Sequence, residues 1–165
     1  MAKVKSAAKG KSNMPRRYRL YLDTSVPNAY FDEKNLYRQE ITRQFWSRLK
    51  DYDVLISDLV IREMKATGNK KLRNELTELV KHFELLSTKS DEIRLLAERY
   101  VSEGIIPVRH IEDAVHIAVT TVNSLDVLVS WNFEHIVKLK TKREVNAVNV
   151  LLGYNPIEII EPGMF

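Results

Sequence analysis

The sequence contains no cysteine, and only five glycines and five prolines occur among its 165 residues. The lack of cysteine excludes a disulfide-stapled scaffold and any zinc or iron–sulfur centre held by thiolates. No apolar run approaches the roughly 20 residues that span a bilayer, and the first residues are charged without the apolar segment of a secretory signal. The remaining composition, 44% apolar and 29% charged, is that of a soluble domain, so we expect a cytoplasmic protein with no membrane partner.

Acidic residues are missing from the first 19 positions, which hold seven of the 26 basic residues. The rest of the chain has 19 basic and 22 acidic residues, so the formal net charge of +4 comes from this N-terminal stretch. We expect residues 1–17 to form a basic, disordered tail and residues 18–165 to form a single domain. A basic tail suits contact with phosphate, and a solvated extension or the remnant of a start at Met14 is the alternative interpretation.

Short apolar runs alternate with segments of helical spacing along the body of the chain. The pattern predicts strands at 19–22, 53–57, 84–87 and 126–130, and a last short strand near 157–160. It predicts helices at 35–50, 58–67, 69–83, 90–103, 111–123 and 141–154, with Asp58 as a cap of the second and Ser90 as a cap of the fourth. This alternation is typical of an α/β fold, a parallel β-sheet flanked by helices on both faces.

Four polar positions are candidates for a site because ligands bind outside the carboxyl ends of parallel strands. Asp23 follows the first predicted strand, and Asn132 lies just beyond the strand at 126–130. Glu63 lies on the helix after the second strand, and Asp113 lies in the first turn of the helix at 111–123. Oxygen ligands without thiolates select Mg²⁺ or Mn²⁺.

Each of these acids also has an ordinary structural role available. Asp23 would cap the turn after its strand, Asp113 would be a first-turn acid favoured by the helix dipole, and Glu63 would lie on a solvated helix face. Their joint placement after strands, rather than any one of them, indicates a site. Ala114 and Ala118 lie one turn apart next to Asp113 and allow that helix to approach the sheet closely.

Four motifs together resemble a PIN domain of the VapC-like type over about residues 18–160. They are LDTSV at 22–26, SDLVIREM at 57–64, EDAVHIAVTTVN at 112–123 and DVLVSWNFEHIV at 126–137. Members of that family are metal-dependent ribonucleases, and many are toxins of prokaryotic toxin–antitoxin modules. The resemblance implies the same fold, a parallel sheet sandwiched by helices.

Carried over to this sequence, the resemblance makes Asp23, Glu63 and Asp113 the catalytic, metal-binding acids. Asn132 stands where many relatives carry a fourth acid, so as a metal ligand it would supply a neutral carbonyl oxygen and one negative charge fewer. The resemblance also implies an antitoxin protein and a second copy of the chain as partners.

Side chains next to the acids are candidates for supporting roles. Thr24 and Ser25 can donate hydrogen bonds to a ligand carboxylate, a metal-bound water or a phosphate, or can satisfy the start of a helix. His116 follows Asp113 by three residues and so shares its helix face, which permits contact with phosphate or a carboxylate. For His116 and for His135 the favoured interpretation is a hydrogen-bonded packing histidine.

The reaction that the resemblance implies is hydrolysis of an RNA phosphodiester by a water that a divalent ion activates. Arg62 and Lys65 lie beside Glu63 and would follow the RNA backbone, unless they only form a solvated helix face. The alternative is a non-catalytic PIN-fold module that binds RNA or protein with a metal site weakened at Asn132. A phosphatase of the haloacid dehalogenase type is disfavoured, because it needs a second aspartate where Ser25 stands.

Overall fold

The computed structural model describes residues 15–165, so most of the expected tail at 1–17 lies outside the described residues. Arg16 and Arg17 lie inside the described part, and both contact the domain. Arg16 donates to the Asp126 carboxylate at 2.7 Å, and Arg17 donates to the backbone carbonyl of Lys50 at 2.6 Å. Arg16 and Arg17, which were expected to belong to the tail, therefore contact the body of the protein.

Five parallel strands form one sheet in the order β3-β2-β1-β4-β5. The strands are β1 (Arg19–Leu22), β2 (Asp53–Ser57), β3 (Glu84–Leu86), β4 (Val127–Val129) and β5 (Glu158–Ile160). The central strand is β1, in which Leu20 lies opposite Val54 of β2 and Val127 of β4. Leu20, Tyr21 and Leu22 are fully buried, as expected for a strand covered on both faces.

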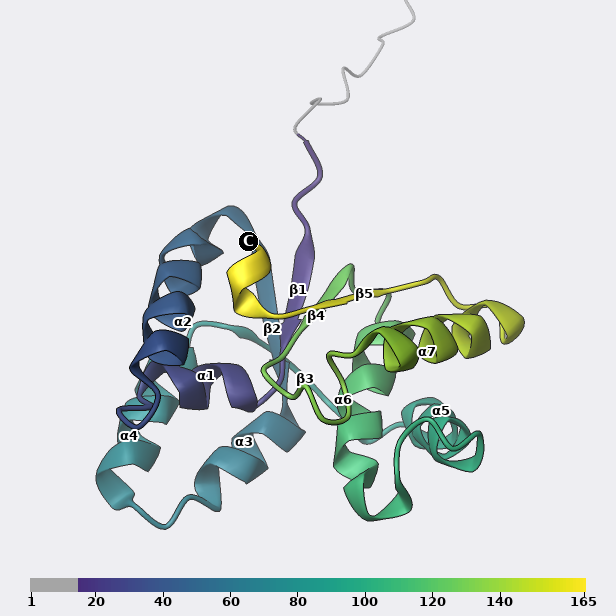
Figure 1. Cartoon of the computed structure of the whole chain (residues 1–165), viewed down its shortest axis with the longest axis horizontal. Helices are drawn as coiled ribbons and strands as arrows, with labels where there is room; N and C mark the ends of the chain where they lie inside the picture. The colour runs from purple at the N-terminus through teal and green to yellow at the C-terminus, as the bar shows by residue number, and fades with distance from the viewer. Residues whose placement is uncertain (1–14) are drawn as a thin grey trace, which may run out of the picture.

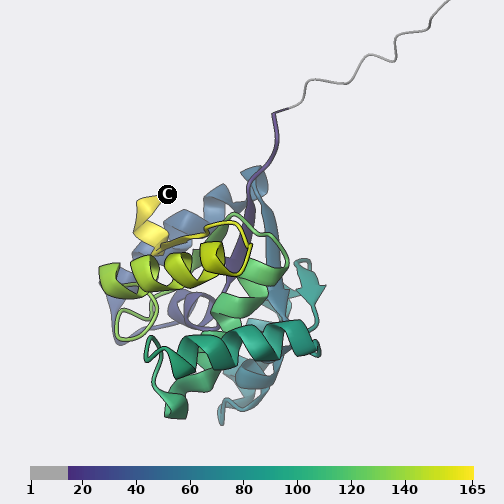
Figure 2. The same cartoon turned by 90° about the vertical axis from the view of Figure 1, so that its right-hand side faces the viewer.

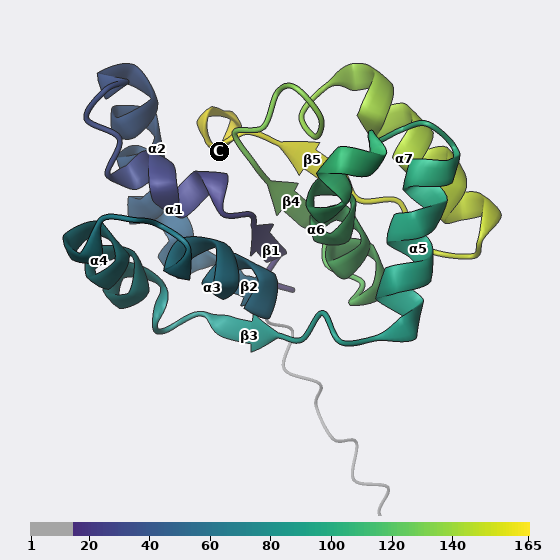
Figure 3. The same ribbon diagram turned by 90° about the horizontal axis from the view of Figure 1, so that it is seen from below.

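Within residues 15–165, seven α-helices cover the sheet in two layers. They are α1 (Ser25–Tyr30), α2 (Leu36–Arg48), α3 (Asp58–Lys65), α4 (Lys70–Val80), α5 (Asp91–Ser102), α6 (Ile111–Val122) and α7 (Leu139–Leu151). Helices α1 to α4 lie on one side of the sheet and α5 to α7 on the other (Figures 1 and 3). Figure 2 faces the second layer, with α5, α6 and α7 in front of the strands. The predicted α/β fold, with helices on both faces of a parallel sheet, is confirmed.

The predicted elements differ from the observed ones at several ends. Helix α1 was not predicted, and neither were the three short 3₁₀-helices η1 (Leu49–Asp51), η2 (Val108–His110) and η3 (Pro162–Met164). The helix expected at 69–83 ends at Val80, and the one expected at 141–154 runs from Leu139 to Leu151. None of the helices in the described part combines the length and the apolar character that crossing a bilayer requires.

The prediction that Asp58 caps its helix is wrong, whereas Ser90 does cap α5. Asp58 is the first residue of α3, and its carboxylate accepts hydrogen bonds from the backbone N–H and the hydroxyl of Thr88 at 3.0 and 2.6 Å. The Ser90 hydroxyl accepts from the N–H of Ile93 at 3.4 Å. Asp58 therefore ties the loop between β3 and α5 to the first turn of α3.

All five strands point the same way, so their carboxyl ends meet at one edge of the sheet. Asp23 comes directly after β1, Ser57 is the last residue of β2, and Ser130 comes directly after β4. Because these three strands are neighbours, the order of the sheet gathers polar residues that are far apart in the sequence.

Candidate active site

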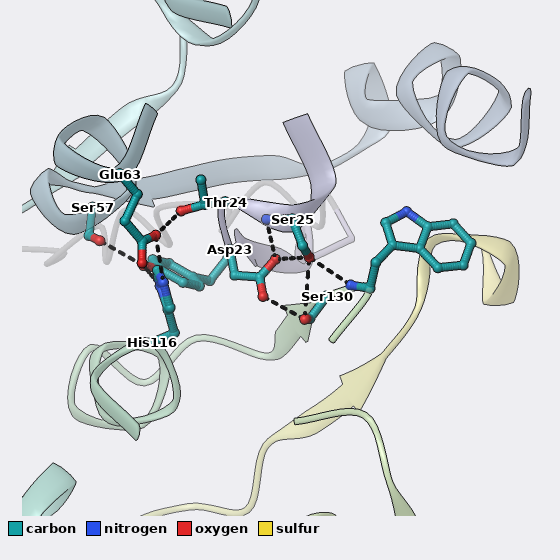
Figure 4. A network of polar contacts seen from close by, with 9 residues as sticks. Asp23, Thr24, Ser25, Ser57, Glu63, His116 and Ser130 are labelled. Atoms are coloured by element: carbon teal, nitrogen blue, oxygen red, sulfur yellow. Dashed lines mark hydrogen bonds and ion pairs between the residues drawn. The ribbon is translucent and has the colours of Figure 1, made fainter. Parts of the chain in front are cut away.

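Asp23 lies in the centre of this edge and is 4% exposed. Its Oδ2 accepts a hydrogen bond from the Ser130 hydroxyl at 2.5 Å, and its Oδ1 accepts from both the backbone N–H (3.0 Å) and the hydroxyl of Ser25 (Figure 4). Burial raises the pKa of the Asp23 carboxyl, while the charge of His116 and the serine hydrogen bonds oppose that rise. The serines thus hold in place a carboxylate that burial makes costly to ionise.

Glu63 extends from α3 toward the start of α1. Its Oε2 accepts hydrogen bonds from the Thr24 hydroxyl and from Nε2 of His116, the latter at 3.1 Å. Burial raises the pKa of Glu63, but the hydrogen bond and charge of His116, together with Thr24, outweigh burial and lower it overall. Thr24 is the N-cap residue of α1, yet its side chain makes no capping bond because the hydroxyl is engaged with Glu63.

His116 is 3% exposed and joins Glu63 to the core. Its Nδ1 lies 2.8 Å from the Tyr21 hydroxyl, which lies 2.7 Å from the hydroxyl of Ser57. Burial lowers the pKa of His116, but the bond to Glu63 and the charges of Asp23, Glu63 and Asp113 more than offset burial and raise it overall. His116 is therefore a hydrogen-bonded histidine in contact with one of the predicted acids and under the field of all three.

Asp113 lies in the first turn of α6 and contacts a different histidine. Its Oδ2 is 2.8 Å from Nδ1 of His135, and the His135 ring packs against that of His110 with centroids 4.0 Å apart. One ligand atom from each of His110, Asp113 and His135 lies within 4.8 Å of the others. In the part of the chain that the structure describes, this is the one group of three or more carboxylate or imidazole side chains close enough to share a metal ion.

Asn132 has a structural role in the turn after β4. Its Oδ1 accepts the backbone N–H of His135 at 2.9 Å, and its own N–H donates to the Ser130 hydroxyl at 2.9 Å. These bonds hold the turn that carries His135 toward Asp113. The role of Asn132 as a metal ligand stays a prediction.

A cavity of about 420 Å³ lies beside these groups and is lined by Glu63, Asp113, His110 and Arg62, among others. The structure thus brings Glu63 and Asp113 to one cavity, while Asp23 does not line it. Lys65 is exposed at the end of α3 and does not line the cavity either.

Several residues that organise the site were not predicted from the sequence. Tyr21 was assigned only to a buried strand, and neither Ser57 nor His110 was considered. Ser130 was noted only for its place after a strand. The available signal was a polar group inside or at the end of an apolar run, as in RLYL and DVLIS. The hydrogen-bond partners of these polar groups lie far away in the chain: Ser57 is 36 residues from Tyr21, and Ser130 is 107 residues from Asp23. The fold was therefore needed to identify them.

Comparison with known proteins finds similar folds among solved structures. A scan against protein-family models and a search of curated proteins both find no match. The crystal structure of VapBC2 from Rickettsia felis bound to a DNA fragment from its promoter contains a chain that matches with a TM-score of 0.53 and 10% identity, over 87% of this chain and 98% of that one. The structure of DNA-bound VapBC from Salmonella typhimurium matches with a TM-score of 0.54 and 14% identity, over 88% and 98%.

The chain therefore has a three-layered α/β fold that is shared with chains of VapBC complexes. More narrowly, its fold is that of a VapC-like PIN domain, as the sequence motifs predicted.

Proposed function

We propose that this protein is a metal-dependent endoribonuclease that hydrolyses RNA phosphodiester bonds as the toxin of a toxin–antitoxin module. The observation that carries this proposal is the placement of Glu63 and Asp113 at one cavity, where Glu63 bonds buried His116 and Asp113 bonds His135. The VapC-like fold supports the same function, because that family consists of metal-dependent ribonucleases.

The chemistry of the donor set fits a divalent cation. Within residues 15–165, neither lysine nor arginine forms an ion pair with Asp23, Glu63 or Asp113, so histidine is the cationic partner within reach. A buried carboxylate whose pKa is raised gains from a cation that offsets its charge. Oxygen ligands alone suit Mg²⁺, but the imidazoles of His110 and His135 beside Asp113 favour Mn²⁺.

The chain's own residues would bind and orient the cation and the scissile phosphate. Asp113 with His110 and His135 would hold the cation, Glu63 would face it from the same cavity, and Asp23 is the further acid that the family resemblance assigns to it. The cation would supply Lewis-acid chemistry by lowering the pKa of a water and offsetting charge on the phosphate oxygens. Ser25 and Ser130 fix both oxygens of Asp23 by hydrogen bonds.

Three further hydrogen bonds orient the other two acids. Thr24 and His116 fix one oxygen of Glu63, and His135 fixes one oxygen of Asp113. Arg62 lines the cavity beside Glu63, and with Lys65 it would contact the RNA backbone.

An antitoxin protein is the partner that this function requires. The matching chains come from VapBC complexes, which supports an antitoxin for this chain as well. A homodimer remains a prediction from the family resemblance.

Cleavage of a mixed-sequence single-stranded RNA by the purified, partner-free protein tests the proposal. We expect cuts with Mn²⁺, fewer with Mg²⁺ and none with EDTA. Asp113→Asn should abolish cleavage because it removes a cation ligand, whereas Asp91→Asn, a change in the first turn of α5, should leave it intact. Full activity of Asp113→Asn would contradict the assignment.

A non-catalytic RNA- or protein-binding module is the second candidate. Two facts about Asn132 favour this module. Asparagine supplies no fourth acid at that position, and its Oδ1 already accepts the backbone N–H of His135. Folded protein that binds RNA but cuts it with neither cation would identify this module.

A further inference from the structure

A second cavity lies on the other side of Asp23 and has aromatic walls. Its volume is about 490 Å³, within the range of sites that hold small organic ligands. Tyr37 of α2, Trp131 and Phe133 line it, with Arg38 and Glu161 among the polar residues. Tyr37 is 76% exposed and Phe133 is 53% exposed, so two large aromatic side chains are left open to solvent at one cavity.

This cavity is connected to the proposed active site through Trp131. The backbone N–H of Trp131 donates to the Ser25 hydroxyl at 2.8 Å, and the same hydroxyl donates to Asp23. The indole N–H of Trp131 donates to Thr42 at 2.9 Å, which fixes the ring as a wall of the cavity. These bonds tie a wall of the cavity to Ser25, the residue that also fixes Asp23.

We propose that this cavity binds one unpaired nucleobase of the RNA strand, an inference that rests on the proposed ribonuclease function. Bases of single-stranded RNA stack on aromatic side chains, and Tyr37 and Phe133 offer such faces. Arg38 also lines the cavity, and its guanidinium is paired with Asp32 at 2.6 Å.

Glu161 makes guanine the best-suited base. A carboxylate in the cavity repels phosphate and accepts hydrogen bonds, so it selects a base edge that donates. Guanine presents two adjacent N–H donors on its Watson–Crick edge, whereas adenine and cytosine present one amino group there and uracil one imino group. One oxygen of Glu161 accepts the N–H of Gly163, which orients the carboxylate.

Binding of fluorescein-labelled UUGUU, UUAUU, UUCUU and UUUUU in EDTA tests the inference without any need for catalysis. We expect UUGUU to bind best, and Tyr37→Ala or Phe133→Ala to weaken its binding by about 5- to 100-fold, the range for loss of one base–aromatic stack. Glu161→Gln should reduce the preference for UUGUU over UUUUU. Tyr18→Ala removes a 62% exposed tyrosine at the opposite end of β1 and should change nothing.

The outcomes separate this inference from the proposed function. Binding that depends on Tyr37 and Phe133, in a protein that cuts no RNA with any cation, supports the nucleobase site and overturns the nuclease. Cleavage with unaltered cut positions and unaltered pentanucleotide affinity in both variants overturns the nucleobase site and leaves the nuclease. If Tyr37→Ala and Phe133→Ala keep their affinity for RNA but no longer bind an antitoxin protein, the nucleobase site is also overturned. A protein segment would then fill the cavity.

Discussion

Tyr21 links the core to the proposed active site at the scale of a single residue. Its ring lies in the central strand and is fully buried, and its hydroxyl lies between Ser57 and Nδ1 of His116. Burial raises the pKa of Tyr21 well above its usual value, so the hydroxyl stays protonated and is able to donate a hydrogen bond. The orientation of His116 toward Glu63 therefore depends on a residue of the sheet.

Replacement of Tyr21 by phenylalanine tests this dependence. Tyr21→Phe leaves the buried Ser57 hydroxyl and Nδ1 of His116 without their partner, and we expect a loss of about 1 to 3 kcal/mol in the free energy of unfolding. The matched control is Tyr18→Phe, because Tyr18 is exposed and should change stability by less than about 0.5 kcal/mol. Urea denaturation measures both, and equal midpoints for the two variants would show that the Tyr21 hydroxyl carries no such role.

Asp23 makes stability depend on pH and on a divalent cation. Burial raises its pKa, so its favourable contribution is complete below its usual pKa and is lost as pH rises through the raised pKa. In metal-free protein, the free energy of unfolding of the wild type relative to Asp23→Asn should therefore fall with rising pH in the range above about pH 4, the usual pKa of an aspartate. Urea denaturation across this range measures the difference, and a constant difference would contradict the shift.

A bound cation should restore the stability that the ionised Asp23 carboxylate loses at higher pH. At a concentration of about 100 times Kd, Mn²⁺ should stabilise the wild type by about 2.7 kcal/mol, which raises Tm by about 5 to 10 °C. Asp23→Asn should show almost no rise. The same rise in both proteins would place the cation away from Asp23.

The sequence offers a reason to propose the acids of the site but not their contacts. Asp23 and Asp113 were proposed because each follows a local pattern, an apolar strand or a helix start. His135 was assigned to packing, because its contact with Asp113 spans 22 residues and depends on a turn that Asn132 holds. Side-chain contacts of this kind have no local signature in a single sequence.

At the scale of elements, the strands were predicted more accurately than the short helix α1. Strands were predicted within about two residues because parallel strands covered on both faces are short apolar runs. Helix α1 was not predicted, because it has only six residues with Pro27 in its first turn. Gly104 follows the helix predicted at 90–103, and its φ of +73° shows why glycine suits the end of α5.

A pair of glycine variants isolates this backbone requirement. A Cβ at Gly104 would meet no atom within 4 Å, so Gly104→Ala should destabilise the protein by about 1 kcal/mol through its left-handed backbone alone. Gly68 is equally open but has no positive φ, so Gly68→Ala should be neutral or stabilising by up to about 1 kcal/mol. Thermal unfolding compares the two, and an equal Tm for both variants would contradict the requirement.

Strand order decides the site at the scale of the whole molecule. The fold class followed from the alternation of strands and helices, but the order β3-β2-β1-β4-β5 did not. The pairing of β1 with β2 and with β4 puts the ends of these three strands side by side and so brings Asp23, Ser57 and Ser130 to one edge. Order in a sheet depends on how the helix layers pack, which a single sequence does not encode locally.

The charge of the whole molecule depends on its first 13 residues. A chain that starts at Met14 loses four lysines and keeps 22 basic and 22 acidic residues, so its formal net charge falls from +4 to zero. If these lysines contact RNA phosphates, their removal should weaken the salt dependence of binding, with the slope of log K against log salt reduced by up to about 3. RNA binding measured across a salt series, for the full chain and for the chain from Met14, gives the two slopes.

A full-length variant with Lys3, Lys5, Lys9 and Lys11 changed to glutamine separates charge from length. It should behave as the shorter chain does, because each phosphate contact with a single strand contributes about −0.7 to the slope through counterion release. Equal slopes for all three proteins would assign phosphate binding to the folded domain, where Arg62 lines the cavity beside Glu63 and Asp113. Arg62→Gln would then be the variant that lowers the slope, by about 0.7.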